Sequence, residues 1–225
     1  MNTKESITQA YNHAADEYAT AFWNELDKKS FDRIILNWFA AQIPAGESVL
    51  EIGAGPGEIS GYLARLGVTC LGTDRSERMI ENARKYFPQV KFEVQDFFHL
   101  KYADQSFRGV VGFYAIVNLT PEEIKTALLE VKRVLKDDGL FLFSFHIFEG
   151  EEKTDVEKFF SQEANALTFY YFKVDDVREW VESAGYQIVD ILIRYPYKDA
   201  EYQSKRAYFV ARKPRGDLES SLTDK

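Results

Sequence analysis

The sequence predicts an α/β fold built on a doubly wound, mostly parallel sheet of seven strands. Short apolar runs alternate with segments of helical periodicity from residue 48 to about residue 145, and again from residue 175 to residue 193. Alternating strands and helices are typical of a parallel sheet covered by helices on both faces. Near the C-terminus two apolar runs, YQIVDILI and RAYFVARK, follow one another with no full helix between them. They predict an antiparallel edge to the sheet.

The expected strands and helices are bounded by residues with clear local preferences. Pro44 and Gly46 end the two N-terminal helices. Ser76 is placed to cap a helix, and Thr120 followed by Pro121 opens another. We expect strands at 48–52, 68–74, 90–94, 109–117, 140–145, 186–193 and 206–213. We expect two helices within 4–42, and further helices at 58–66, 77–86, 121–135 and 175–184.

A single domain is expected to span residues 1–213. Its N-terminal helices, 1–43, are expected to close over the site. The segment 147–173 mixes charges with aromatic residues and breaks the strand–helix rhythm, which predicts an insertion on the substrate side. Its aromatic side chains would form either a roof over a substrate or a contact in a homodimer. The polar tail, 214–225, is expected to be disordered.

Composition argues against several classes of protein. The chain has 225 residues, of which 45% are hydrophobic and 28% charged, as in a folded globular domain. A formal net charge of −8 argues against nucleic acid as a partner. No run approaches the roughly 20 apolar residues that span a membrane, so no membrane insertion is expected. The lone cysteine, Cys70, predicts a cytoplasmic protein without an internal disulfide, and three dispersed histidines argue against a metal site.

The stretch EIGAGPG, which begins at Glu51, predicts a ligand site. A strand that turns into a helix through Gly53, Gly55 and Gly57 presents backbone N–H groups with no side chains in the way. Asp74 ends the next strand 23 residues after Glu51, where an acid can accept hydrogen bonds from ribose hydroxyls. Both features are typical of a nucleotide-type site.

The glycine spacing differs from that of a dinucleotide-binding loop. Such a loop places its third glycine one residue later, where this chain has Glu58. A carboxylate at that position would repel a pyrophosphate. Acids before and after the loop therefore favour a ligand with a cationic head and no phosphate group.

With EIGAGPG, the stretches GTD, VQDF, GVVGFYAIVNL and LKDDGLFLFSF resemble successive motifs of class I S-adenosylmethionine-dependent methyltransferases. The resemblance covers roughly residues 8 to 212 and is to the small-molecule branch similar to ubiquinone-biosynthesis enzymes. It implies a Rossmann-like fold with N-terminal lid helices. It also implies S-adenosyl-L-methionine as cofactor and S-adenosyl-L-homocysteine as product.

The resemblance implies roles for individual residues. The glycine loop would border the methionine part of the cofactor, with Glu51 near its amino group. Asp74 would bind the ribose, Asp96 the adenine amino group, and Phe97 would border the adenine ring. The expected cofactor-binding residues are Glu51, Gly53, Ala54, Gly55, Gly57, Asp74, Arg75, Asp96, Phe97, Phe113, Tyr11 and Tyr18.

Several of these residues also have a plainer interpretation. Tyr11 and Tyr18 lie in YNHAADEY, which looks like the family's lid helix, but they equally suit core contacts on one helix face. Asp74 could cap the helix that begins near Ser76. Asp96 could simply be one of the acids that are common in loops after strands.

Two residues depart from the family pattern. Arg108 stands where an aspartate is common, and Asn118 stands where a histidine is common, so a proton acceptor at that second position is missing. The expected catalytic residues are therefore His146, as a base at the end of the fifth strand, and Tyr114 near the end of the fourth. A lone histidine at a strand end is, however, more often a hydrogen-bonded structural residue.

We expect transfer of a methyl group to a small-molecule acceptor by in-line displacement. Two other functions remain open for the same loop. One is a non-catalytic S-adenosylmethionine-binding regulatory module, and the other is an NAD-dependent oxidoreductase, against which the glycine spacing argues. The acceptor atom, whether oxygen, nitrogen, carbon or sulfur, is left open.

Overall fold

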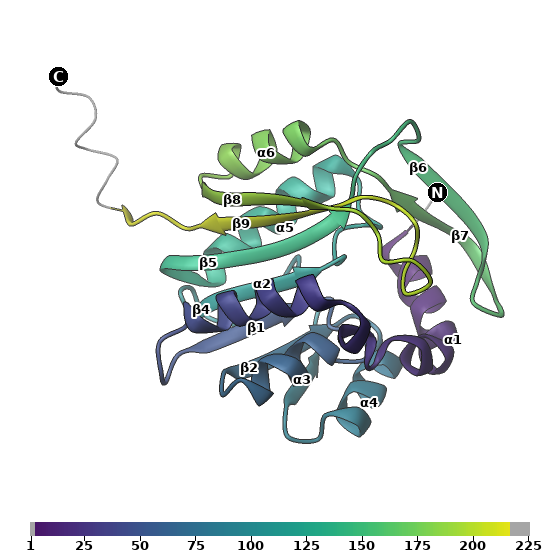
Figure 1. The fold of residues 1–225 in the computed structure, drawn as a ribbon, viewed down its shortest axis with the longest axis horizontal. Helices are drawn as coiled ribbons and strands as arrows, with labels where there is room; N and C mark the ends of the chain where they lie inside the picture. The colour runs from purple at the N-terminus through teal and green to yellow at the C-terminus, as the bar shows by residue number, and fades with distance from the viewer. Residues whose placement is uncertain (1–2, 217–225) are drawn as a thin grey trace.

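A seven-stranded sheet in the order β3-β2-β1-β4-β5-β9-β8 forms the centre of the protein (Figure 1). The computed structural model describes residues 3–216, except for the side chains of 164–166. The strands of this sheet are β1 Ser48–Ile52, β2 Thr69–Asp74, β3 Lys91–Val94, β4 Phe107–Phe113, β5 Leu135–His146, β8 Gln187–Arg194 and β9 Arg206–Arg212.

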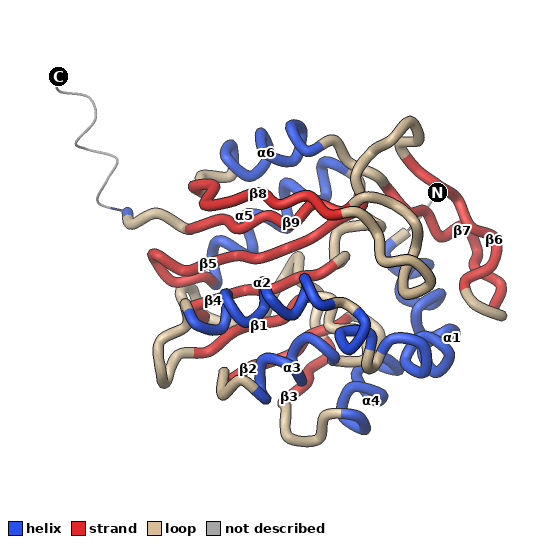
Figure 2. Tube along the Cα trace, viewed as in Figure 1, coloured by secondary structure: helices blue, strands red, loops and turns tan. Residues whose placement is uncertain are grey.

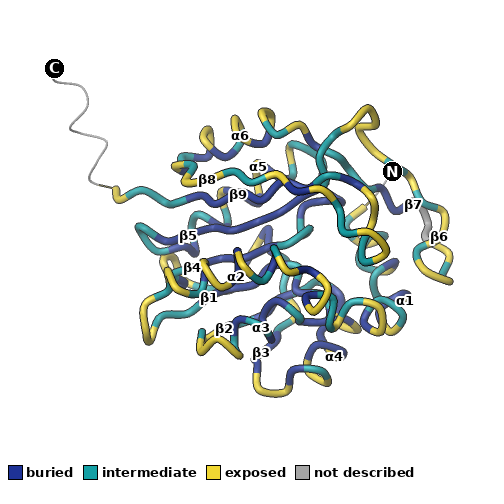
Figure 3. The backbone as a smooth tube through the Cα atoms, in the orientation of Figure 1, coloured by how far each residue is buried: buried dark blue, intermediate teal, exposed yellow. Residues whose placement is uncertain are grey.

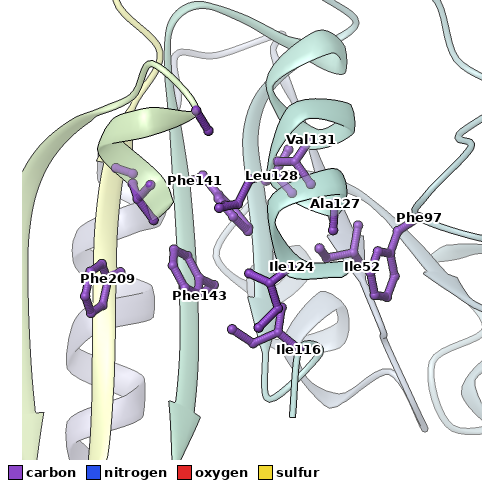
Figure 4. Close-up of a cluster of buried hydrophobic side chains, with 14 of the residues drawn as sticks. Ile52, Phe97, Ile116, Ile124, Ala127, Leu128, Val131, Phe141, Phe143 and Phe209 are labelled. Carbon is purple, nitrogen blue, oxygen red and sulfur yellow. The ribbon is translucent and has the colours of Figure 1, made fainter. Parts of the chain in front are cut away.

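Helices cover both faces of the sheet. Their bounds are α1 Lys4–Phe22, η1 Glu25–Lys28 (a 3₁₀ helix), α2 Ser30–Ala41, α3 Glu58–Arg65, α4 Glu77–Tyr86, α5 Pro121–Val134 and α6 Val174–Ser183. On β1, Val49 packs with α2 and α3, whereas Leu50 packs in the cluster that holds α5 and α6. Figure 4 shows part of that second cluster, where Ile124 and Leu128 of α5 meet Phe143 of β5. The predicted doubly wound α/β fold is confirmed.

The antiparallel strand is β9. It lies between β5 and β8 and pairs antiparallel with both, which leaves β8 outermost. The other five strands pair in parallel. The predicted antiparallel edge is therefore confirmed, and the central strands are the most deeply buried part of the chain (Figure 3).

The insertion expected at 147–173 contains a two-stranded hairpin. It consists of β6, Lys153–Phe159, and β7, Gln162–Tyr170. Figure 1 shows α1 and this hairpin at the same end of the sheet. Ala10 and Leu167 are buried in one apolar cluster where α1 and β7 meet. Two segments far apart in the sequence thus form one cover.

Some expected boundaries differ from the structure. The fourth strand ends at Phe113, sooner than expected, because Tyr114 takes a left-handed conformation with φ of 56° that a strand cannot continue. The fifth strand begins earlier than expected because Leu135 already pairs with Phe107. The outer part of the tail, 217–225, lies outside the described residues.

Residues 3–216 contain neither a membrane-spanning helix nor a cluster of metal-binding side chains. No helix in this part of the chain is both long and apolar enough to cross a membrane. In the same residues, no cluster of three or more His, Cys, Asp and Glu side chains is placed to hold a metal ion.

Gly57 and Gly46 share a backbone conformation but not their surroundings. Their φ angles are 87° and 85°, which a residue with a side chain adopts at a cost of about 1–2 kcal/mol. A Cβ at Gly57 would stand 2.6 Å from the Phe92 ring, whereas one at Gly46 would meet no atom within 4 Å. We expect Gly57→Ala to lower the free energy of unfolding by about 1–3 kcal/mol more than Gly46→Ala does. Urea unfolding of both variants measures the difference, and equal losses would contradict it.

Candidate functional site

A cavity of about 410 Å³ lies at the carboxyl ends of the parallel strands. Its walls come from the loops after β1, β2, β3, β4 and β5, from α1 and η1, from the hairpin and from the loop between β8 and β9. Figure 2 shows these loops gathered at the end of the sheet beside α1. Cavities of this size accept small organic ligands. The predicted site residues line the cavity except for Gly57 and Asp96.

The carboxylate of Asp74 fixes the glycine loop. Its Oδ2 accepts the N–H of Gly55 at 2.9 Å, and its Oδ1 accepts the N–H of Ser76 at 2.8 Å. Ser76, rather than Asp74, caps α4, because the Ser76 hydroxyl accepts the N–H of Met79 at 3.1 Å. The hydrogen bonds of Asp74 join the loop after β1 to the end of β2. Burial raises the pKa of this carboxyl.

The backbone at Gly55 faces the cavity without obstruction. Its φ is 50°, and a Cβ there would meet only a ring carbon of Tyr18 at 3.7 Å. A Cβ at Gly53, in contrast, would stand 2.9 Å from the Cβ of Ala115. Gly55 therefore leaves the main chain accessible to a ligand, and Gly53 lets the loop pack against the segment that follows β4.

Glu51 is buried beneath the glycine loop. It is only 2% exposed, and its Oε2 accepts the N–H of Ser60 at 2.9 Å as well as the Ser60 hydroxyl. Burial raises the pKa of Glu51 to about 8, although the bonds from Ser60 lower it. A cation bound nearby would favour the charged form of this carboxyl.

Asp96, Arg75 and Phe97 lie at the ends of β2 and β3. Asp96 Oδ1 accepts the N–H of Phe98 at 3.1 Å, and Asp96 Oδ2 lies 3.8 Å from Arg75 Nε. Phe97 is buried and stacks on Phe98, with ring centroids 5.1 Å apart. Arg75 and Phe97 line the cavity, and Asp96 is joined to its wall through Arg75.

Asn118 ties α1 and the hairpin together over the cavity. The hydroxyl of Tyr11 donates to Asn118 Oδ1 at 2.8 Å, and Asn118 Nδ2 donates to the carbonyl of Thr168 at 2.8 Å. The Tyr11 ring also contacts Phe159 at 5.0 Å and Tyr18 at 6.0 Å between centroids. The residue that departs from the family pattern is thus a bridging amide in the cover.

Tyr114 and His146 stack on each other at the ends of β4 and β5. Their ring centroids are 5.0 Å apart. Arg206 Nε donates to the Tyr114 hydroxyl at 2.8 Å, and His146 Nδ1 lies 2.7 Å from Ser204 Oγ. Burial, aided by the charge of Arg206, lowers the pKa of His146 to about 3. The imidazole is therefore neutral at physiological pH.

A buried ion network next to Tyr114 was not predicted from the sequence. Lys29 Nζ lies 2.7 Å from Glu25 and 3.4 Å from Glu201, and Arg206 Nε lies 3.2 Å from Glu201. All four charged residues line the cavity. The one readable signal was the i, i+4 spacing of Glu25 and Lys29. Glu201 lies in the loop between β8 and β9 and Arg206 begins β9, and no sequence motif marks either residue.

The known proteins that this chain resembles are methyltransferases. Residues 49–139 match a family model described as a methyltransferase domain. A putative methyltransferase of Geobacillus sp. (strain WCH70) is 24% identical, over 94% of this chain and 100% of that protein. An uncharacterized methyltransferase of Oceanobacillus iheyensis is 31% identical over 47% of this chain, and the match spans half of that protein's own length.

A solved structure shares the fold across most of the chain. It is the 1,6-didemethyltoxoflavin-N1-methyltransferase of Burkholderia thailandensis, with a TM-score of 0.73 at 17% identity. The match covers 94% of this chain and 88% of that one. That structure holds 1,6-didemethyltoxoflavin and S-adenosylhomocysteine. At this identity the likeness establishes a shared fold.

The raised pKa of Glu51 makes stability depend on pH. Its folded-state pKa of about 8 lies above the ordinary 4.5, so the protonated form stabilises the fold and this contribution is lost as pH rises through about 8. The wild type should therefore lose several kcal/mol of unfolding free energy between pH 5 and pH 9 that the Glu51→Gln variant does not lose. Urea unfolding at both pH values measures this, with the exposed Glu122→Gln as control. If the unfolding free energies of the wild type and Glu51→Gln changed with pH in parallel, Glu51 would not be the buried acid described.

The lowered pKa of His146 can be measured directly. Because its pKa is about 3, the ring should stay neutral from pH 5 to pH 8. Proton NMR titration of the imidazole C–H resonances, with His146→Asn to assign the signal, should show no titration of His146 in this range. A midpoint near pH 6.5 would contradict the burial described for this ring.

Proposed function

We propose that the chain is a class I S-adenosylmethionine-dependent methyltransferase that transfers a methyl group to a small-molecule acceptor by in-line displacement. One observation carries this proposal. An unobstructed main-chain turn, fixed by two carboxylates, faces a cavity large enough for a nucleoside and a small second ligand. The sequence match and the shared fold supply the class of reaction.

The residues around the turn suit this cofactor. We assign the methionine end to the main chain at Gly55 and to Glu51, whose charged form a cation favours. Asp74 is assigned to the ribose, since each of its oxygens retains a second acceptor site beside the N–H that it already accepts. The adenine is assigned to Phe97, with Asp96 reached through Arg75.

The remaining predicted residues would complete the cofactor site. Ala54 and Phe113 line the cavity beside the glycine loop and at the end of β4. Tyr11 and Tyr18 face it from α1. When bound, the cofactor supplies a methyl group on a sulfonium, and a neutral thioether leaves, so the protein need not protonate a leaving group.

The chain's own contribution is to align the reactants and exclude water. Orientation of reacting groups contributes up to roughly 7–11 kcal/mol in well-ordered systems. The rings of Tyr18, Phe22 and Phe159 provide a dry wall, with the Tyr18 and Phe22 centroids 4.6 Å apart. Aromatic faces also attract a cationic centre by roughly 0.5–2 kcal/mol.

The enclosed cavity favours a small acceptor over a macromolecule. α1 and the hairpin are joined across it through Tyr11, Asn118 and Thr168. A polymer segment would have to break this connection. The Burkholderia enzyme of the same fold acts on 1,6-didemethyltoxoflavin according to its name, which is in keeping with a small acceptor here.

Tyr114 and His146 are assigned to the acceptor side. Arg206 fixes the Tyr114 hydroxyl, so the phenol is a rigid wall of the acceptor site. His146 is neutral, and its Nδ1 is engaged by Ser204. We assign His146 to hydrogen bonding with the acceptor through Nε2, because a ring of such low pKa holds a proton poorly.

Calorimetry with S-adenosylhomocysteine and NAD tests the proposal. We expect S-adenosylhomocysteine to bind and NAD not to bind. Asp74→Ala should weaken S-adenosylhomocysteine binding by roughly 10- to 100-fold, as expected for lost hydrogen bonds to a charged group. The exposed Asp176→Ala should leave the affinity unchanged.

Two results would contradict this account. If calorimetry detected binding of NAD but not of S-adenosylhomocysteine, the chain would be an oxidoreductase. Unchanged affinity in a folded Asp74→Ala variant would remove the ribose assignment. Turnover of S-adenosylmethionine with any small acceptor would in turn eliminate a purely regulatory module.

A further inference from the structure

Glu58 carries a carboxylate oxygen that nothing in the chain satisfies. It is the first residue of α3 and lines the cavity. Among the residues that the structure describes, Glu58 Oε2 is the one buried side-chain nitrogen or oxygen without a hydrogen-bond partner. Buried polar groups are nearly always paired, so an orphaned carboxylate oxygen in a cavity wall points to a missing partner.

The charges around Glu58 are unequal in number. Lys29 is shared by Glu25 and Glu201, and Arg206 pairs with Glu201 as well. Both cations are therefore committed to other acids, and Glu58 forms no ion pair within the described part of the chain. Arg194 also pairs with Glu201 and with Asp32, so Glu58 and this network together have four carboxylates, those of Glu25, Asp32, Glu58 and Glu201, for three cations. One positive charge would complete it.

Burial makes this imbalance significant. Burial, together with the negative charges of Glu25 and Glu51, raises the pKa of Glu58 well above its usual range. A carboxyl in this situation either takes up a proton or binds a cation. A ligand that brings a cation to Glu58 is therefore favoured over a neutral ligand of the same shape, which leaves the carboxyl unpaired.

Glu58 lies between Glu51, beneath the glycine loop, and the ion pair of Glu25 with Lys29, since the charges of all three act on it. Lys29, one of the charges that act on Glu58, lies 5.6 Å from the centroid of the Tyr114 ring. Tyr114 in turn stacks on His146. Glu58 is thus linked to the two residues assigned to the acceptor through Lys29.

We propose that the methyl acceptor is an amine, which binds as its ammonium ion with the Glu58 carboxylate as counter-ion. This inference rests on the proposed methyltransferase function and names its substrate class. A protonated amine meets three needs of the site, since it supplies the missing charge, donates hydrogen bonds to the carboxylate and contains the nitrogen to be methylated.

The same carboxylate accounts for the proton that the amine must lose. The ammonium passes one proton to Glu58, which frees the nitrogen lone pair. The nitrogen then forms a bond to the methyl carbon while the carbon–sulfur bond breaks, and both bonding electrons stay on sulfur. The products are a protonated N-methylamine, the neutral thioether and protonated Glu58, which releases its proton to solvent when the product leaves.

A pair of matched probes tests this. Calorimetry compares 2-phenylethylamine, protonated at pH 7, with the uncharged 2-phenylethanol, each with and without saturating S-adenosylhomocysteine. We expect the amine to bind wild-type protein at least about tenfold more tightly than the alcohol, and the preference to vanish in Glu58→Gln. Glu77→Gln is the control, because Glu77 is the exposed first residue of α4 just as Glu58 is the first residue of α3.

Each other outcome overturns the inference in a recognisable way. Equal binding of amine and alcohol to the wild type would remove the cation site. If Glu58→Gln weakens S-adenosylhomocysteine but not 5′-methylthioadenosine, which lacks the amino-acid part, Glu58 serves the cofactor's ammonium instead. If S-adenosylhomocysteine fails to bind the wild type, the proposed function fails, while the comparison of amine and alcohol without it still decides the role of Glu58.

Discussion

The anchored turn after β1 is the constraint on which the rest of the site depends. Glu51 holds it from beneath through Ser60, and Asp74 holds it from the side through the N–H groups of Gly55 and Ser76. Both anchors are carboxylates that accept hydrogen bonds from main chain, so they fix the turn and leave the main chain at Gly55 open to the cavity. The position proposed for the cofactor rests on this geometry.

Enclosure of the cavity has two consequences with one physical cause. The cover formed by α1 and the hairpin limits access of water to the cavity, which suits the proposed displacement at a sulfonium by an aligned nucleophile. The same loss of water makes every unpaired charge in the wall costly. The pKa of His146 falls and the pKa values of Glu51 and Glu58 rise for this shared reason. Exclusion of water therefore selects the charge of the ligand as well as its alignment.

Local features of the chain were predictable from the sequence, whereas long-range polar contacts were not. The strands, the glycine turn and Asp74 are each marked by residues close in sequence. Asn118 could be recognised as a departure from the family pattern, but its partner Tyr11 lies 107 residues away. The pairing of Lys29 with Glu201 depends on a loop conformation that no local pattern encodes. The sequence identified Glu58 as an acid that does not suit a pyrophosphate and favours a cationic ligand, but its unpaired oxygen is a property of the folded cavity.

A crystal structure of the complex with S-adenosylhomocysteine tests the central claim most directly. It should show the nucleoside in the cavity, with both ribose hydroxyls within hydrogen-bond distance of Asp74, the amino-acid part along the main chain at Gly55, and the sulfur facing Tyr114. A ligand bound elsewhere, or in the cavity with its ribose away from Asp74, would contradict the role given to the anchored turn.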